Sequence, residues 1–273
     1  MAVACCQPGD ADAPWLTGRF VVLGQVPIMR ALRTKLPTLR AWAVHFYTSL
    51  GLVAGLLALI ATADGRPRDV FIFLGLALWI DATDGMLARG WEVTVWTPRF
   101  DGRKLDDITD YVNYTLVPVF FIYQFGLVSG AWTLSLPIVL MASAYGFCQK
   151  AAKTEDGYYT GFPSYWNVLA FYFYLFGPHP ALYGALLVLF SALVFVPIKY
   201  IYPSRTPFLR SLNIALGFFG FLIICLIVIN FDDPDPRLVY LSLIYPIYYM
   251  VLSFYLHFRP RLHSWLRFSH SRD

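Results

Sequence analysis

Long apolar runs, bounded by charged residues, glycine or proline, divide most of the chain into eight stretches. A run of roughly 20 apolar residues is long enough to cross the hydrocarbon core of a bilayer as a helix. The pattern therefore predicts an all-α fold, a polytopic transmembrane helical bundle of about eight spans. The expected spans are residues 41–62, 69–89, 105–127, 131–150, 163–177, 180–201, 208–230 and 238–258, of which the fifth is the shortest.

Composition supports this interpretation. Of the 273 residues, 58% are hydrophobic and only 14% are charged, which is too apolar for an ordinary soluble domain. We therefore expect a single transmembrane domain over residues 41–258, with a cytoplasmic segment at 1–40 before it and a basic cytoplasmic tail at 259–273. The first 15 residues have no basic segment followed by an apolar run, so they do not resemble a cleaved signal peptide.

The segment before the first span mixes apolar and basic positions. Residues 26–42 interleave leucine, isoleucine and methionine with four basic side chains. This pattern predicts a short amphipathic helix in the headgroup layer of the membrane, broken near Pro37. A plain basic anchor flanking a membrane span explains the same residues equally well.

Basic residues are unevenly distributed between the loops that the eight spans define. Short cytoplasmic loops carry an excess of lysine and arginine. With an even number of spans and both termini in the cytoplasm, only Arg66, Arg68 and Arg237 fall on the outer side. The same rule accounts for the basic loops without a nucleic-acid partner.

Two pairs of aspartates stand where the second span ends and the third begins. Asp81 and Asp84 are three residues apart, and Asp106 and Asp110 are four apart, so each pair shares one helix face. A short connection favours the two helices as neighbours. We therefore expect four carboxylates to converge on a pocket that opens to the cytoplasm.

Carboxylates in an apolar run need compensation. An aspartate at the bilayer centre costs roughly 2.5 to 3.5 kcal/mol on insertion scales, and less near the interface. Mg²⁺ or Mn²⁺ accepts oxygen ligands and bridges substrate phosphates, and two such ions suit a phosphoryl displacement. The alternative, that these aspartates only cap helix ends, explains Asp106 and Asp110 but leaves Asp81 and Asp84 unexplained.

The residues between these aspartates suit a phosphate-bearing ligand. Gly85 removes a side chain where a nucleotide must approach, and Ala88 keeps that face shallow. Arg89 supplies a fixed positive charge with a fork of donors for phosphate oxygens. Gly102 offers a flexible approach just before the third span.

Together these positions form D-x2-D-G-x2-A-R followed by G-x3-D-x3-D, a pattern that resembles the signature of the CDP-alcohol phosphotransferase family. Many members have eight residues between the arginine and the second glycine, whereas this chain has twelve, from Gly90 to Asp101. The longer spacer, the eight expected spans and the stretch 153–167 resemble the bacterial phosphatidylcholine synthase branch.

The resemblance implies an enzyme, a CDP-diacylglycerol–choline O-phosphatidyltransferase of the bacterial inner membrane. It implies that CDP-diacylglycerol and choline are the substrates, that membrane lipid surrounds the enzyme, and that the chain forms a homodimer. Asp81, Asp84 and Asp106 are the implied ligands of Mn²⁺ or Mg²⁺, and Asp110 completes the metal site and acts as the general base. The implied CDP-binding residues are Gly85, Ala88, Arg89 and Gly102.

A quaternary ammonium is usually held by aromatic faces with help from carboxylates. Residues of this kind occur at the cytoplasmic ends of the expected spans, where Tyr and Trp also occur for the general reason that they line membrane interfaces. The candidates for holding choline are Tyr111, Tyr114, Tyr145, Glu155, Tyr165 and Trp166.

Two other functions remain compatible with the sequence. One is a related transferase that uses serine, glycerol phosphate or inositol phosphate as the acceptor, because Lys150 and Lys153 could bind a phosphorylated acceptor. The other is an ion-coupled transporter with acidic residues inside the membrane. A transporter would be favoured by inverted repeats or paired broken helices, and the sequence displays neither.

Overall fold

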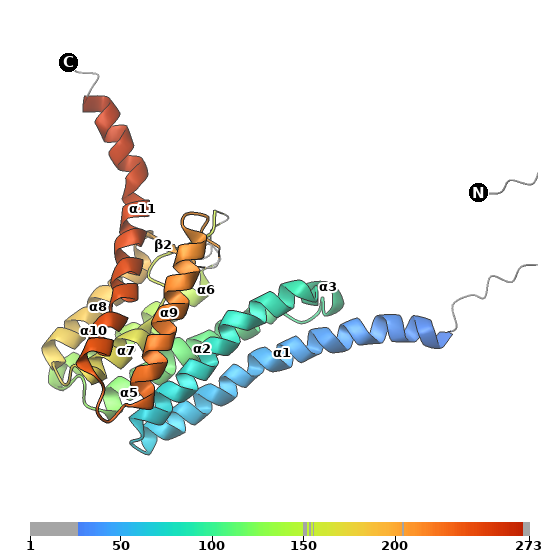
Figure 1. Ribbon diagram of the computed structural model, residues 1–273, viewed down its shortest axis with the longest axis horizontal. Coiled ribbons are helices and arrows are strands. Elements are labelled where there is room, and N and C mark those ends of the chain that lie inside the picture. Colours follow the sequence, from blue (N-terminus) through green and yellow to red (C-terminus); the bar gives the residue numbers. More distant parts are fainter. Residues whose placement is uncertain (1–26, 150–151, 153, 155, 204, 270–273) are drawn as a thin grey trace, which may run out of the picture.

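The computed structural model describes residues 27–149, 152, 154, 156–203 and 205–269, with side chains described within 35–259 (Figure 1). The helical elements are α1 Pro27–Ala63, α2 Pro67–Gly90, α3 Val93–Trp96, α4 Gly102–Tyr111, η1 Val112–Leu116, α5 Val117–Gln124, η2 Gly130–Leu134, α6 Ser135–Cys148, α7 Trp166–Leu175, α8 Pro180–Phe195, α9 Arg210–Ile229, α10 Pro236–Ser242 and α11 Ile244–Ser269. Two three-residue strands, β1 Tyr158–Thr160 and β2 Lys199–Ile201, pair antiparallel. The expected all-α membrane fold is confirmed.

Among the residues that the structure describes, five stretches are long and apolar enough to cross a membrane, by length and composition. They are Lys35–Ala63, Pro67–Gly90, Gly130–Cys148, Arg210–Ile229 and Pro236–Arg259. The third expected span is helical throughout 102–124, but a π-helical turn, η1, divides it into α4 and α5. Pro118 is the second residue after this turn, and a proline, which cannot donate a backbone hydrogen bond, commonly distorts the preceding turn.

The helix α1 is longer than the sequence predicted. It runs without interruption through Pro37, so the expected break near that residue is wrong. Proline removes one helical hydrogen bond, and the leucine, lysine and arginine residues around it are strong helix formers that continue the helix. Figure 1 shows the N-terminal part of α1 extending beyond the rest of the bundle.

The expected fifth and sixth spans form shorter helices. The 10 residues of α7 rise about 15 Å, half the thickness of a bilayer core. The sixth span does not reach residue 201, because α8 ends at Phe195 and Val196 is extended. Pro197 disfavours a helical residue before it. The chain then enters β2 instead of continuing the helix.

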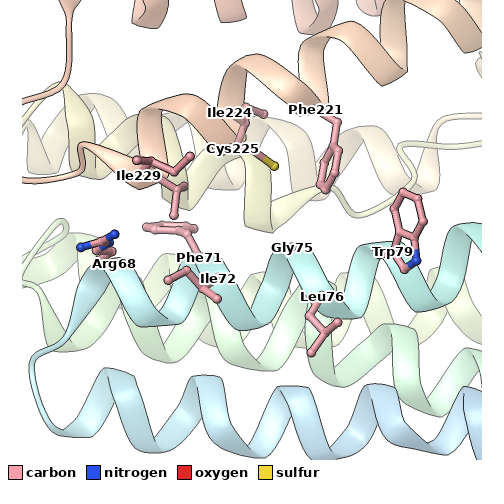
Figure 2. A pocket seen from close by; sticks show the side chains of 11 residues that line it. Arg68, Phe71, Ile72, Gly75, Leu76, Trp79, Phe221, Ile224, Cys225 and Ile229 are labelled. Atoms are coloured by element: carbon pink, nitrogen blue, oxygen red, sulfur yellow. The ribbon is translucent and has the colours of Figure 1, made fainter.

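An apolar cavity of about 340 Å³ lies between α2 and α9 (Figure 2). Phe221, Ile224 and Cys225 of α9 face α2 across it, and Arg68 and Trp79 lie at its two ends. The cavity is lined almost entirely by apolar side chains. It holds none of the aspartates that the sequence singled out.

Candidate metal and phosphate site

Three of the four expected carboxylates come together. The side chains of Asp81 and Asp84, near the end of α2, and of Asp106, in α4, place one oxygen each within 4.8 Å of one another. We refer to these three residues as the carboxylate cluster. Asp84 is buried, whereas Asp81 and Asp106 are partly exposed. The cluster is therefore enclosed by protein at Asp84 and accessible from outside at Asp81 and Asp106.

The helix α1 supports the cluster from behind. It packs along α2, and Thr48 donates a hydrogen bond of 2.7 Å to Oδ2 of Asp84. One position earlier, the hydroxyl of Tyr47 is 2.8 Å from that of Thr83. Both contacts fix the rotation of α2 about its axis, so that its carboxylates point toward α4.

Glycines in α1 allow the third helix to approach. A methyl group at Gly51 would lie 2.6 Å from Cγ2 of Thr109, and one at Gly55 would lie 2.8 Å from Oδ1 of Asn113. Asn113 also donates a 3.0 Å hydrogen bond to the carbonyl of Gly51. Small residues four apart let membrane helices pack backbone to backbone. This close packing positions Asp106 beside α2.

Asp110 lies one helical turn beyond Asp106, on the same face of α4. Tyr114, which follows in η1, donates a 2.7 Å hydrogen bond to Oδ2 of Asp81. The same hydroxyl interacts electrostatically with both Asp81 and Asp110. Tyr114 therefore connects the carboxylate cluster to Asp110. The π-helical turn shifts the register between α4 and the residues after it, which brings this tyrosine toward α2.

The donor set of the cluster fits a divalent cation. At separations near 4.8 Å and an effective dielectric constant of about 20, each pair of ionised carboxylates repels by about 3.5 kcal/mol. A cation with a preference for oxygen ligands removes this repulsion. The hydrogen bonds from Thr48 and Tyr114 orient Asp84 and Asp81, as outer partners of metal ligands commonly do.

The expected CDP-binding residues lie beside the cluster. Arg89 is exposed at the end of α2, and a methyl group at Gly85 would lie 3.2 Å from its guanidinium Nη1. Gly85 thus gives the Arg89 side chain room to fold over the helix. Ala88 is partly exposed. A methyl group at Gly102 would lie 2.9 Å from Cε1 of His45, so the imidazole is the near neighbour that this glycine accommodates.

The expected choline-binding residues divide into two groups. Tyr114 and Tyr165 both interact electrostatically with Asp81. The others are engaged elsewhere or lie outside the described residues.

Tyr111 donates a 3.1 Å hydrogen bond to the carbonyl of Leu140. Tyr145 is exposed and packs against Phe195. Trp166 is completely buried, and its indole donates a 2.7 Å hydrogen bond to Ser143. Glu155 lies outside the described residues. These positions leave Tyr114 and Tyr165 as the expected aromatics nearest the chemistry.

Sequence analysis missed the supporting residues in α1. A signal was present for two of them, because Gly51 and Gly55 form a small-x3-small pattern within an apolar run, which marks a helix-packing face. Thr48 gave no signal. A lone threonine in a membrane helix usually bonds to its own helix backbone.

No protein-family model matches the chain. Curated proteins do match it. It is 36% identical to the phosphatidylcholine synthase of Pseudomonas aeruginosa over 220 residues, which cover 80% of this chain and 89% of that protein. It is 36% identical to the phosphatidylcholine synthase of Legionella pneumophila over 229 residues, covering 81% and 89%. The chain belongs to the phosphatidylcholine synthase family.

A third relative matches over a similar share of the chain. The phosphatidylcholine synthase of Borreliella burgdorferi is 33% identical over 226 residues, which cover 81% of this chain and 96% of that protein. The membership expected from the spaced aspartates is confirmed. The chain that carries the carboxylate cluster therefore belongs to a family of membrane-bound phosphatidyltransferases.

Proposed function

We propose that the protein is a phosphatidylcholine synthase, which transfers the phosphatidyl group of CDP-diacylglycerol to choline and releases CMP. The observation that carries the proposal is the cluster of Asp81, Asp84 and Asp106 within 4.8 Å, at one end of a membrane bundle, in a chain of this family. In our proposal, this end of the bundle lies on the cytoplasmic side of a bacterial inner membrane, and both termini lie on the same side.

The carboxylate cluster, completed by Asp110, would hold one or two Mn²⁺ or Mg²⁺ ions. Bound there, the metal supplies Lewis-acid stabilisation for the pyrophosphate and for the oxygen that leaves with CMP. Arg89 and the shallow surface at Gly85 and Ala88 bind the nucleotide part.

The reaction is a single displacement. The hydroxyl oxygen of choline attacks the phosphorus that carries the diacylglycerol, and the bond from this phosphorus to the oxygen of CMP breaks. Asp110 accepts the proton of the choline hydroxyl, which is too weakly acidic to ionise alone. Tyr114 donates a 2.7 Å hydrogen bond to Asp81 and follows Asp110 by four residues. It therefore fixes the position of the general base relative to the carboxylate cluster.

Purified full-length protein in lipid nanodiscs tests the proposal. With CDP-diacylglycerol and Mn²⁺ or Mg²⁺ present, CMP and phosphatidylcholine should form only when choline is added. Equal CMP release with serine, glycerol phosphate or inositol phosphate would assign a different acceptor. Asp81→Asn should abolish the reaction, whereas Asp233→Asn, an exposed aspartate of the segment between α9 and α10, should leave it unchanged. Activity in Asp81→Asn at the wild-type level would refute the site.

The same preparation tests for the homodimer that the family resemblance implies. Mass measurement by light scattering, corrected for bound lipid and detergent, should give twice the mass of the chain. A single-chain mass with full activity would remove the dimer from the proposal.

A further inference from the structure

Four tyrosines from widely separated parts of the chain form two ring pairs. Tyr159 lies in β1, Tyr165 directly precedes α7, Tyr202 follows β2, and Tyr249 lies in α11. The rings of Tyr159 and Tyr202 stack with centroids 4.4 Å apart. Those of Tyr165 and Tyr249 are 5.6 Å apart and nearly perpendicular, at 72°. We call these four residues the tyrosine box.

The rings of the box are held in place by the backbone around them. Tyr249 donates a 3.0 Å hydrogen bond to the carbonyl of Ile201 in β2. This bond holds the ring of Tyr249, against which the ring of Tyr165 packs. Pairing of β1 with β2 aligns Tyr159 with Tyr200, one residue before Ile201. The box is therefore a fixed arrangement of aromatic faces.

A glycine fixes the loop that carries two of these rings. Gly161 lies between Tyr159 and Tyr165 and has a φ of +83°, and a methyl group there would lie 2.3 Å from the carbonyl oxygen of Val194. No other residue type fits this contact with the end of α8 without moving the backbone. The loop is thus pinned against α8, which sets where the two rings stand.

The box borders the reaction site. The helix α7 packs against η1, whose Tyr114 donates a 2.7 Å hydrogen bond to Asp81 of the carboxylate cluster. Tyr165 directly precedes α7, and Tyr159 lies six residues before Tyr165, in β1. Both retain exposed surface although they are surrounded by other side chains, so they border accessible space. Burial among the neighbouring rings raises the pKa of Tyr159 above its ordinary value, which keeps its hydroxyl neutral. The box thus offers uncharged aromatic faces next to a carboxylate.

We propose that the tyrosine box binds the quaternary ammonium group of the acceptor alcohol through Tyr159 and Tyr165, with Tyr249 holding Tyr165 in place, and so selects choline. This inference rests on the proposed function and assigns its acceptor subsite. A trimethylammonium group cannot donate an N–H hydrogen bond, and the electron-rich faces of aromatic rings attract its charge. In this proposal, the hydroxyl end of the bound alcohol extends from the box toward the carboxylate cluster and Asp110.

The charges around the box favour a cation over a phosphorylated acceptor. Lys199 forms an ion pair with Asp156. The guanidinium of Arg205 lies 5.2 Å from the ring centroid of Tyr202, so this ring already accepts one cation. Asp156 thus balances the charge of Lys199, and Arg205 occupies the ring of Tyr202, which leaves Tyr159 and Tyr165 as the rings for the acceptor.

Ring-retaining and ring-removing variants test the inference in full-length protein in nanodiscs. Tyr165→Leu and Tyr159→Leu should raise the KM for choline by at least about tenfold, because the cation loses an aromatic face. The KM for CDP-diacylglycerol should stay near the wild-type value. Tyr165→Phe and Tyr159→Phe keep the ring and should stay within about threefold of wild type for choline. Tyr240→Leu, which removes an exposed tyrosine of α10, is the matched control.

A second measurement separates binding of the cation from packing. Tetramethylammonium has the charge without the hydroxyl and should inhibit the wild type competitively with choline, whereas neutral 3,3-dimethylbutan-1-ol should not. The leucine variants should lose this discrimination. An unchanged choline KM in both leucine variants would overturn the proposal that the tyrosine box binds the quaternary ammonium group. Inhibition of the wild type by the neutral alcohol as strong as that by tetramethylammonium would overturn it as well. If wild-type protein does not use choline at all, the proposed function fails instead, so the two failures are distinguishable.

Discussion

Thr48 of α1 donates a 2.7 Å hydrogen bond to Asp84 of α2, across 36 positions of sequence. Both side chains are buried, so the bond is protected from water. It fixes the carboxylate oxygen that accepts it and leaves the orientation of the Asp84 side chain defined before any ligand binds. A residue outside the aspartate motif therefore positions one member of the motif.

Replacing Thr48 with Val should weaken metal binding. Loss of a hydrogen-bond partner behind a metal ligand typically lowers affinity 10- to 100-fold. The Mn²⁺ concentration that gives half-maximal CMP release should rise by at least about tenfold. Thr62→Val is the matched control, because Thr62 is buried in the same helix and bonds only to the carbonyl of Ala58. Equal Mn²⁺ dependence in the two variants would exclude a positioning role for Thr48.

Asp110→Asn should separate catalysis from binding. The amide cannot accept the choline proton, so turnover should fall by roughly 10²- to 10⁴-fold, the usual contribution of a general base. Binding of CDP-diacylglycerol, measured by isothermal titration, should change little. Wild-type turnover in this variant would remove Asp110 as the base, and lost nucleotide binding would make it a metal ligand only.

Removing the metal should affect both activity and stability. EDTA should abolish CMP release, and Mn²⁺ or Mg²⁺ should restore it. Metal at 100 times its dissociation constant should stabilise the folded protein by about 2.7 kcal/mol, because it binds the folded state and relieves repulsion within the cluster. Melting followed by intrinsic fluorescence should show this gain in wild type and a smaller one in Asp84→Asn. Identical curves with EDTA and with metal would contradict the site.

Two glycine substitutions should have opposite effects on stability. At Gly75, in the middle of α2, an added methyl group meets nothing within 4 Å, so Gly75→Ala should stabilise the protein by about 0.5–1 kcal/mol. At Gly55 a methyl group would lie 2.8 Å from Asn113 and Val112, so Gly55→Ala should destabilise it by about 1–3 kcal/mol. Thermal inactivation in detergent measures both. A loss of similar size at the two positions would argue against close packing at Gly55.

The carboxylate cluster could be predicted from the sequence because it depends on the spacing of residues close together in the chain. Asp81 and Asp84 share a helix face by periodicity alone, and a short connection makes the next helix a neighbour. The lengths of the later helices were harder to predict. Apolar residues continue past Phe195 into β2, so hydropathy extended a span that Pro197 ends.

The support of the cluster and the tyrosine box could not be predicted in the same way. Thr48 reaches Asp84 only because α1 packs against α2 at one particular rotation. Tyr159 meets Tyr202 only because two three-residue strands pair in one register. Such contacts depend on tertiary packing between distant segments, and a single sequence carries no local pattern for them.

The antiparallel pairing of β1 with β2 has a consequence for how this enzyme family can diversify. Every aspartate of the reaction site comes from residues 81–110, whereas the aromatic rings beside it come from residues 159–249. In the proposed function, the chain thus separates the cleavage of the nucleotide from the choice of alcohol into its two halves. Exchange of the second half between related enzymes offers a route to new headgroups that leaves the phosphoryl chemistry intact.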